Sequence, residues 1–140
     1  MSEIKISGIV RHLLIVDDDV DNLELFTLIL QNYHFNVDAY SDPLQAFLEF
    51  KANCYDLIIL DYFMPVLNGM ELYKRIKEID KRARVIFLTA SFVELYANKE
   101  ALETIRKPIR MGEFLQHIKS ALTPQVKSEL LNSQTNPIPI

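Results

Sequence analysis

LIILD, residues 57–61, is an unbroken apolar run that ends on an aspartate. Two further runs have the same form and lead into polar residues: LLIV (13–16) into Asp17 and Asp18, and VIFL (85–88) into Thr89. Runs that are apolar along their whole length are typical of strands buried on both faces, as in parallel sheets covered by helices. Because parallel strands end at one edge, we expect these polar residues to meet where open α/β sheets place their sites.

Strand and helix patterns alternate along the chain. We expect strands at residues 13–16, 36–40, 56–60, 84–88 and 103–106. We expect helices at residues 20–33, 43–51, 70–79, 92–99 and 109–122, of which the fourth is short. The alternation, with right-handed crossovers, predicts an α/β fold: a doubly wound (βα)5 parallel sheet with helices on both faces.

The bulk properties fit one small domain. The chain has 140 residues, 49% of them hydrophobic, which is enough to bury a core but leaves no room for a second catalytic domain. Its net charge of −4 gives no electrostatic footprint for nucleic acid, so we expect no direct nucleic acid binding. No apolar stretch reaches the roughly 18 residues of a membrane span, and the N-terminus lacks a signal-peptide core. These features predict a cytoplasmic protein without membrane insertion.

The polar residues at the strand ends suit phosphoryl chemistry. The last expected strand leads into Lys107, which adds an ammonium group to the same edge. A carboxylate can attack phosphorus when a divalent cation neutralises the phosphoryl oxygens, and Asp61 is our candidate for this nucleophile. Thr89 can donate its hydroxyl to one phosphoryl oxygen, and Lys107 can pair with another. Asp17 and Asp18 offer the hard oxygen ligands that suit Mg²⁺.

Four segments together resemble the response-regulator receiver domain, the phosphoacceptor module of two-component signalling. They are HLLIVDDD (12–19), LIILDYFMPVLNGMEL (57–72), VIFLTAS (85–91) and IRKPI (105–109). One such segment would be a weak signal, but four in the right order are specific. The resemblance covers about residues 11–122 and implies a flavodoxin-like sheet with strand order 2-1-3-4-5. We expect residues 123–140 to form a C-terminal tail, in which Thr123 and Pro124 could cap a short helix before a mobile end.

The resemblance also implies a role for each site residue. Asp61 accepts the phosphoryl group, Asp18 and Asp61 ligate Mg²⁺ directly, Asp17 acts through water, and the backbone carbonyl of Phe63 completes the ligand set. It implies a cis bond after Lys107. The implied phosphodonor is a histidine kinase or a histidine phosphotransfer protein. The domain would signal through contacts with an unnamed protein, and would not be an enzyme beyond its own phosphotransfer and dephosphorylation.

Other interpretations of these residues remain open. The acidic cluster at 17–19 could cap the helix that follows, and Asp61 could merely form a turn. The pair Asp17 and Asp19 also resembles the first motif of haloacid-dehalogenase-type phosphatases, with Asp17 as the nucleophile, although no later acidic pair is present to hold the metal. A third interpretation is a receiver-like scaffold that binds partners without being phosphorylated.

Two departures from the receiver pattern affect signal output. The stretch between Thr89 and Lys107 is several residues shorter than usual, so the fourth helix should be truncated or irregular. In the family, the threonine at the end of the fourth strand moves toward the phosphate, and a buried aromatic residue three positions before the lysine follows it. That position here is Thr104. His12, His34 and His117 show no metal-ligand spacing, and we expect them to be ordinary packing or surface residues. We expect Cys54 to be a small buried apolar group.

Overall fold

The computed structural model describes residues 10–90 and 103–123. Five strands form one sheet: β1 (His12–Val16), β2 (Asn36–Tyr40), β3 (Leu57–Asp61), β4 (Val85–Thr89) and β5 (Glu103–Arg106). Neighbouring strands are all parallel, in the order β2-β1-β3-β4-β5. This order confirms the expected doubly wound fold. The helix expected at 92–99 and the tail at 124–140 lie outside the described residues.

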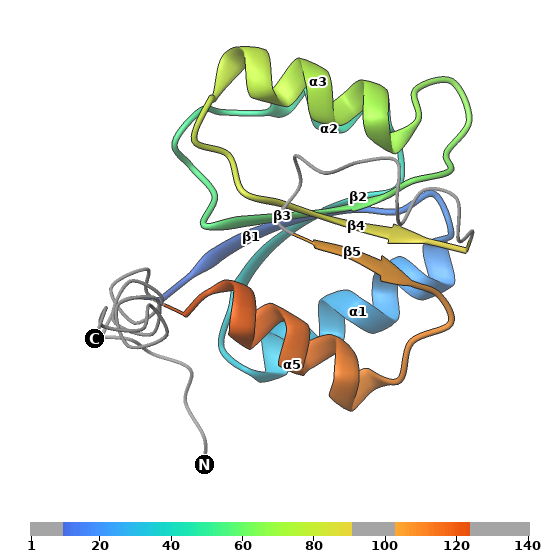
Figure 1. The fold of residues 1–140 in the computed structure, drawn as a ribbon, viewed down its shortest axis with the longest axis vertical. Helices are drawn as coiled ribbons and strands as arrows, with labels where there is room; N and C mark the ends of the chain where they lie inside the picture. Colours follow the sequence, from blue (N-terminus) through green and yellow to red (C-terminus); the bar gives the residue numbers. More distant parts are fainter. Residues whose placement is uncertain (1–9, 91–102, 124–140) are drawn as a thin grey trace, which may run out of the picture.

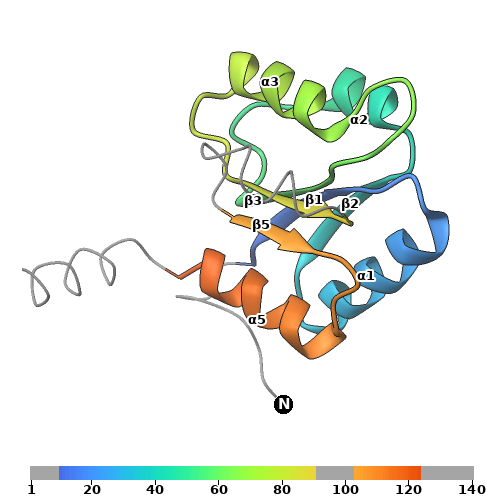
Figure 2. The same ribbon diagram turned by 45° about the vertical axis from the view of Figure 1, so that its right-hand side comes forward.

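Helices cover both faces of the sheet. Figures 1 and 2 show α1 (Val20–Asn32) and α5 (Met111–Ala121) on one face, and α2 (Pro43–Glu49) and α3 (Gly69–Ile79) on the other. Alternate residues of β1 enter two separate cores: Leu13 and Ile15 pack on the α1 and α5 side, and Leu14 and Val16 on the α2 and α3 side. In residues 10–90 and 103–123, no helix is long and apolar enough to cross a membrane.

The strands differ in burial according to their place in the sheet. Every residue of β3 and β4 is buried, as their apolar runs indicate, because helices cover both of their faces. The edge strand β2 has no fully buried residue, which explains its weaker sequence pattern. Strands β3 and β4 each extend to the polar residue that follows the apolar run. Asp61 and Thr89 are therefore held within strands rather than in loops.

Side-chain caps fix where the helices begin. The Asp19 carboxylate accepts hydrogen bonds from the backbone N–H groups of Asp21 and Asn22, so Asp19 caps α1. Asn68 and Glu71 form a reciprocal capping box at the start of α3. Helix capping therefore accounts for Asp19 but not for Asp17 or Asp18, which precede the cap.

Gly69 allows α3 to begin directly against the end of β3. Its N–H donates to the carbonyl of Tyr62 at 2.8 Å. A Cβ atom placed on Gly69 would collide with the carbonyl oxygen of Asp61 and would lie 2.8 Å from the Cα of Tyr62. Both of these are backbone atoms, so relief requires the chain itself to move. The glycine is needed here for close approach of two backbone segments.

We expect Gly69→Ala to lower the free energy of unfolding by about 1 to 3 kcal/mol, the usual cost of overpacking. Gly112 in α5 provides the matched control, because a Cβ atom there meets nothing within 4 Å. Gly112→Ala should instead be neutral or raise stability by up to about 1 kcal/mol, since alanine favours the helix. Urea unfolding of both variants measures the difference. Equal effects of the two substitutions on the free energy of unfolding would contradict this prediction, because they would show that a Cβ atom against the backbone of Asp61 and Tyr62 costs no stability.

Candidate functional site

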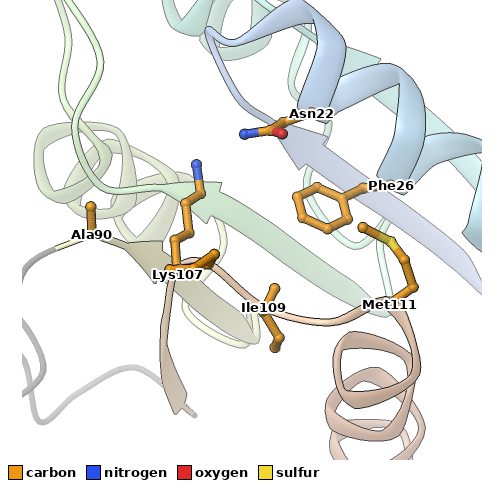
Figure 3. Close-up of a pocket in the computed structure, with 7 residues that line it drawn as sticks. Asn22, Phe26, Ala90, Lys107, Ile109 and Met111 are labelled. Atoms are coloured by element: carbon orange, nitrogen blue, oxygen red, sulfur yellow. The ribbon is translucent and has the colours of Figure 1, made fainter.

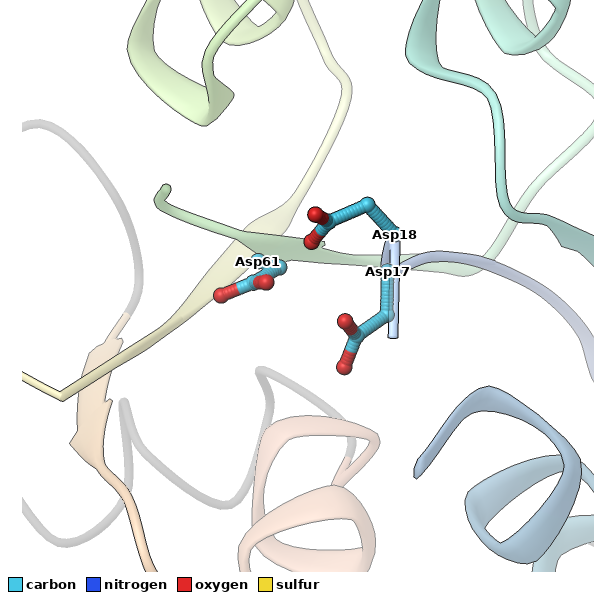
Figure 4. Close-up of side chains that lie close together, drawn as sticks. All are labelled: Asp17, Asp18 and Asp61. Carbon is cyan, nitrogen blue, oxygen red and sulfur yellow. The ribbon is translucent and has the colours of Figure 1, made fainter. Parts of the chain in front are cut away.

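Three carboxylates meet at the carboxyl edge of the sheet. Asp17 and Asp18 directly follow β1, and Asp61 is the last residue of the neighbouring strand β3. One oxygen from each residue lies within 4.8 Å of the others. Figure 4 shows the side chains of Asp17 and Asp18 leaving the backbone in different directions beside Asp61. Asp17 is fully buried and Asp61 nearly so, whereas Asp18 is exposed, so the cluster opens to solvent on the Asp18 side.

Lys107 joins two of these carboxylates. Its Nζ atom lies 3.2 Å from Oδ2 of Asp17 and 3.3 Å from Oδ1 of Asp61. The peptide bond between Lys107 and Pro108 is cis, as expected. The Lys107 N–H donates to the carbonyl of Thr89 at 2.6 Å, which ties this segment to the end of β4. Thr89 is fully buried at that strand end. The structure thus brings Lys107 to the acidic cluster and ties it to the backbone of Thr89.

Asp17 and Asp18 have different surroundings. Oδ1 of Asp17 accepts the backbone N–H of Asp19 at 3.0 Å, while Oδ2 pairs with Lys107. The backbone N–H of Asp17 donates to the carbonyl of Tyr40 at 3.1 Å. Asp17 is therefore held firmly by its neighbours. Within residues 10–90 and 103–123, the Asp18 carboxylate makes no hydrogen bond or ion pair, which leaves both of its oxygens available to a ligand.

Burial and neighbouring charges shift the pKa values of Asp61 and Lys107. Burial, and then the negative charge of Asp17, raise the pKa of Asp61 to about 7, although Lys107 acts in the opposite direction. For Lys107, burial favours a lower pKa, but the carboxylates of Asp61 and Asp17 outweigh it and hold the pKa above its ordinary value. Lys107 is therefore charged at neutral pH.

The donor set fits a divalent cation. When ionised, three carboxylates and one ammonium group leave two negative charges in excess. Ionisation of Asp61 is disfavoured here, and an added positive charge would favour it. All the side-chain donors are carboxylate oxygens, which suit Mg²⁺ better than softer metals. The carbonyl of Phe63, two residues beyond Asp61, lies in the loop that leads to α3.

Comparison with known proteins identifies the family. The model of the response regulator receiver domain matches residues 13–119. The chain belongs to this family. Among curated relatives, the receiver domain is 32% identical over 114 residues to a transcriptional regulatory protein, the CpxR homolog of Haemophilus influenzae, covering 79% of this chain and 49% of the relative. It is 28% identical to the response regulator ArlR of Staphylococcus aureus, covering 86% of this chain and 56% of ArlR. The chain thus spans about half the length of these relatives.

Solved structures of receiver domains have the same fold. In the CheX–CheY–BeF3–Mg²⁺ complex of Borrelia burgdorferi, the matching chain gives a TM-score of 0.75 at 32% identity, over 84% of this chain and 93% of that one. The response regulator TrrA of Thermotoga maritima, crystallised with Mg²⁺ and beryllium fluoride, gives a TM-score of 0.67 at 29% identity, over 81% and 100% of the chains. Receiver domains with this fold therefore include proteins that bind Mg²⁺ and a phosphoryl mimic.

The structure corrects our expectation for Cys54. Cys54 is only half-buried, and its Sγ lies 3.6 Å from Nδ1 of His12, so it is not simply an apolar packing group. His12 also contacts Asp38. Cys54, His12 and Asp38 are far apart in the sequence, so their contacts could not be predicted from spacing.

Proposed function

We propose that this receiver domain accepts a phosphoryl group on Asp61, with Mg²⁺ held by Asp18, Asp61 and the backbone carbonyl of Phe63, and with Asp17 acting through water. The observation that supports this most strongly is the convergence of three carboxylates with Lys107, which pairs with both Asp17 and Asp61. Asp18 is exposed and Asp17 is already bonded on both oxygens, which favours Asp18 as the direct ligand.

Each residue of the cluster has a distinct task. A carboxylate oxygen of Asp61 attacks phosphorus, and the bond to the donor breaks, with its electron pair leaving on the donor atom. Lys107 is placed to move from the Asp61 carboxylate to a phosphoryl oxygen, and the Thr89 hydroxyl to donate to another. Bound Mg²⁺ supplies positive charge that neutralises the phosphoryl oxygens. Asp17 keeps Lys107 in place throughout.

The phosphatase alternative fits the residues less well. It needs Asp17 as an open nucleophile, but Asp17 is fully buried and both of its oxygens have partners. It also leaves Asp61 without a role, although Asp61 is buried at the centre of the cluster. Incubation with acetyl phosphate and Mg²⁺ tests the proposal, since phosphorylation adds ~80 daltons to the intact mass. No mass gain would favour the scaffold interpretation instead.

A histidine kinase or a histidine phosphotransfer protein is the phosphodonor that we propose, in the cytoplasm. A cavity of about 310 Å³ adjoins Lys107, between α1 and the segment before α5 (Figure 3). Phe26, Ile109 and Met111 give it an apolar lining, as expected where a protein donor packs beside the charged site. The absence of direct nucleic acid binding stays a prediction, because the relatives are about twice as long and include a transcriptional regulatory protein.

We expect weak coupling between the phosphorylation site and α5. Thr104 is half-buried on β5, opposite Phe87 of β4, and it has far less apolar area than Tyr or Phe. In the family, the residue at this position moves when the threonine at the end of β4 moves toward the phosphate. For a side chain as small as Thr104, the two positions differ little in burial energy, at ~25 cal/mol per Å². Phosphorylation should therefore shift the equilibrium between these two positions less. Beryllofluoride should shift amide NMR signals strongly near Asp61, Phe63 and Thr89, but weakly at Thr104 and along α5.

Thr104→Tyr is the matched variant for this prediction. It restores an aromatic side chain on β5 without altering the acid cluster, so beryllofluoride should then shift the α5 signals more than in the wild type. Large shifts along Met111–Ala121 in the wild type would contradict the prediction, because they would show that coupling survives without the aromatic residue.

A further inference from the structure

Cys54, His12 and Asp38 form a second cluster, at the other end of β1 from the acid cluster. His12 is the first residue of β1 and Asp17 follows its last, so the two sites are roughly 16 Å apart at the usual rise per residue. The Sγ atom of Cys54 lies 3.6 Å from Nδ1 of His12. Nε2 of the same imidazole lies 3.0 Å from Oδ2 of Asp38. The imidazole of His12 thus lies between a thiol and a carboxylate.

The order of these contacts fixes what the imidazole can do. An ionised carboxylate only accepts hydrogen bonds, so Nε2 of His12 carries the proton that points at Asp38. In the neutral imidazole Nδ1 is then an acceptor, and it faces the thiol of Cys54. This is the arrangement of a nucleophile, a base and a group that orients the base. Cys54 and Asp38 use different ring nitrogens of His12, which is unsuited to joint chelation of one metal ion.

Neighbouring residues hold the carboxylate and the imidazole in place. The hydroxyl of Tyr55 donates to Oδ2 of Asp38 at 2.7 Å, and the ring centroids of Tyr55 and His12 are 4.8 Å apart. Burial, followed by the bond to Asp38, raises the pKa of Tyr55, so this hydroxyl stays a donor. The backbone of His12 exchanges two hydrogen bonds of 2.8 Å with Asp56. The imidazole is therefore fixed by contacts from several elements.

The cluster lines a cavity of about 480 Å³, within the size range of small-molecule pockets. Its walls include the aromatic rings of Tyr40, Phe50 and Tyr55 and the charged groups of Asp38, Glu49 and Lys51. Cys54 is half-buried, so the thiol can be reached from this cavity. With His12 neutral, two carboxylates against one ammonium group make the lining net negative, which favours a neutral or cationic ligand over an anionic one.

We propose that Cys54 is a reversible modification site, at which small neutral or cationic disulfides exchange with the thiol. His12 acts as the base, and Asp38 is the positioning residue that holds its tautomer. The thiol proton passes to Nδ1 of His12, and the thiolate attacks one sulfur of the disulfide. A new S–S bond forms while that of the reagent breaks, and the leaving thiolate takes the proton from His12. The products are a mixed disulfide on Cys54 and one free small thiol.

Cystamine, a cationic disulfide, is the probe for this site. The rate of mixed-disulfide formation on the full chain is followed by intact mass and divided by the rate for an unstructured peptide of residues 50–58. We expect the folded protein to react about tenfold or more faster than the peptide, because only the folded chain places a base beside the thiol. A folded rate equal to or below the peptide rate would overturn the proposal, whatever the variants do. Cys54→Ser should form no adduct.

Single substitutions distinguish the role of His12 as the base from general effects on folding. His12→Gln should bring the rate down to about that of the peptide, whereas His117→Gln, which removes an imidazole paired with Glu103 far from the cavity, should leave it unchanged. Asp38→Asn should lower the rate and move the proton between ring nitrogens of His12, seen by nitrogen NMR of the imidazole. An unchanged rate in folded His12→Gln would refute the role of the base.

Glutathione disulfide, an anionic reagent, tests the class of ligand. Its rate is also divided by the rate for the peptide, which removes differences in intrinsic reactivity between reagents. The ratio should be lower for glutathione disulfide than for cystamine, because Asp38 and Glu49 disfavour an anion in the cavity. An equal or higher ratio for glutathione disulfide would overturn the proposed ligand class.

Discussion

The Asp61→Asn variant should gain no detectable phosphoryl group from acetyl phosphate and Mg²⁺. We expect its phosphorylation rate to fall by more than about 1,000-fold, as is usual when a nucleophile is removed. An amide has the shape of the carboxylate but lacks its nucleophilic charge. Burial and the charge of Asp17 already disfavour ionisation at this position, so the neutral side chain should fold well. Intact mass spectrometry measures the adduct of ~80 daltons, and circular dichroism checks the fold.

Asp17→Asn is the informative companion of this variant. If Asp61 is the acceptor, Asp17→Asn should still form the adduct, but more slowly, because Lys107 loses one of the two carboxylates that position it. The phosphatase interpretation requires the opposite pattern. An adduct that persists in Asp61→Asn and disappears in Asp17→Asn would establish Asp17 as the nucleophile.

The second large effect that we expect is the loss of Mg²⁺ binding when Asp18 is replaced. Asp18→Ala should weaken Mg²⁺ binding by about 100-fold or more, because Asp18 offers the exposed, unbonded carboxylate of the cluster. The same change should leave the metal-free protein as stable as the wild type, or more stable by about 1 kcal/mol, since one of three crowded negative charges is removed. Titration calorimetry and urea unfolding give the two quantities.

Asp19→Ala is the matched control, and it should behave in the reverse way. Asp19 caps α1 through the N–H groups of Asp21 and Asn22, so its loss should cost about 1 kcal/mol of stability. Mg²⁺ affinity should change little, because the Asp19 carboxylate is not part of the cluster. A clear loss of stability in Asp18→Ala with unchanged Mg²⁺ affinity would assign the capping role to Asp18 and contradict the proposed ligand set.

Much of the fold was predictable because its strands have a strong local signal. The apolar runs at 57–60 and 85–88 are buried on both faces, and each expected strand lies within one residue of the observed one. Parallel pairing then explains why Asp17, Asp61 and Lys107 converge, since strand ends share an edge. The strand order itself came from the family resemblance, because apolar runs do not encode which strands are neighbours.

Other features depend on tertiary contacts that no local pattern encodes. The need for glycine at position 69 comes from the approach of α3 to the backbone of Asp61, which the sequence around Gly69 does not show. The acidic cluster allowed two interpretations, and only the hydrogen bonds of Asp19 separate the cap from the site. The contact between Cys54 and His12 joins a loop to the start of β1 across 42 positions of sequence, and no motif marks it.

Mapping the phosphorylated residue tests the central proposal most directly. Borohydride reduces an acyl phosphate to an alcohol but leaves free carboxylates intact, so it marks the acceptor permanently. After treatment of the wild-type protein with acetyl phosphate and Mg²⁺, reduction and fragment mass spectrometry should find homoserine at position 61 alone. Homoserine at position 17, or at any other aspartate in place of Asp61, would contradict the account.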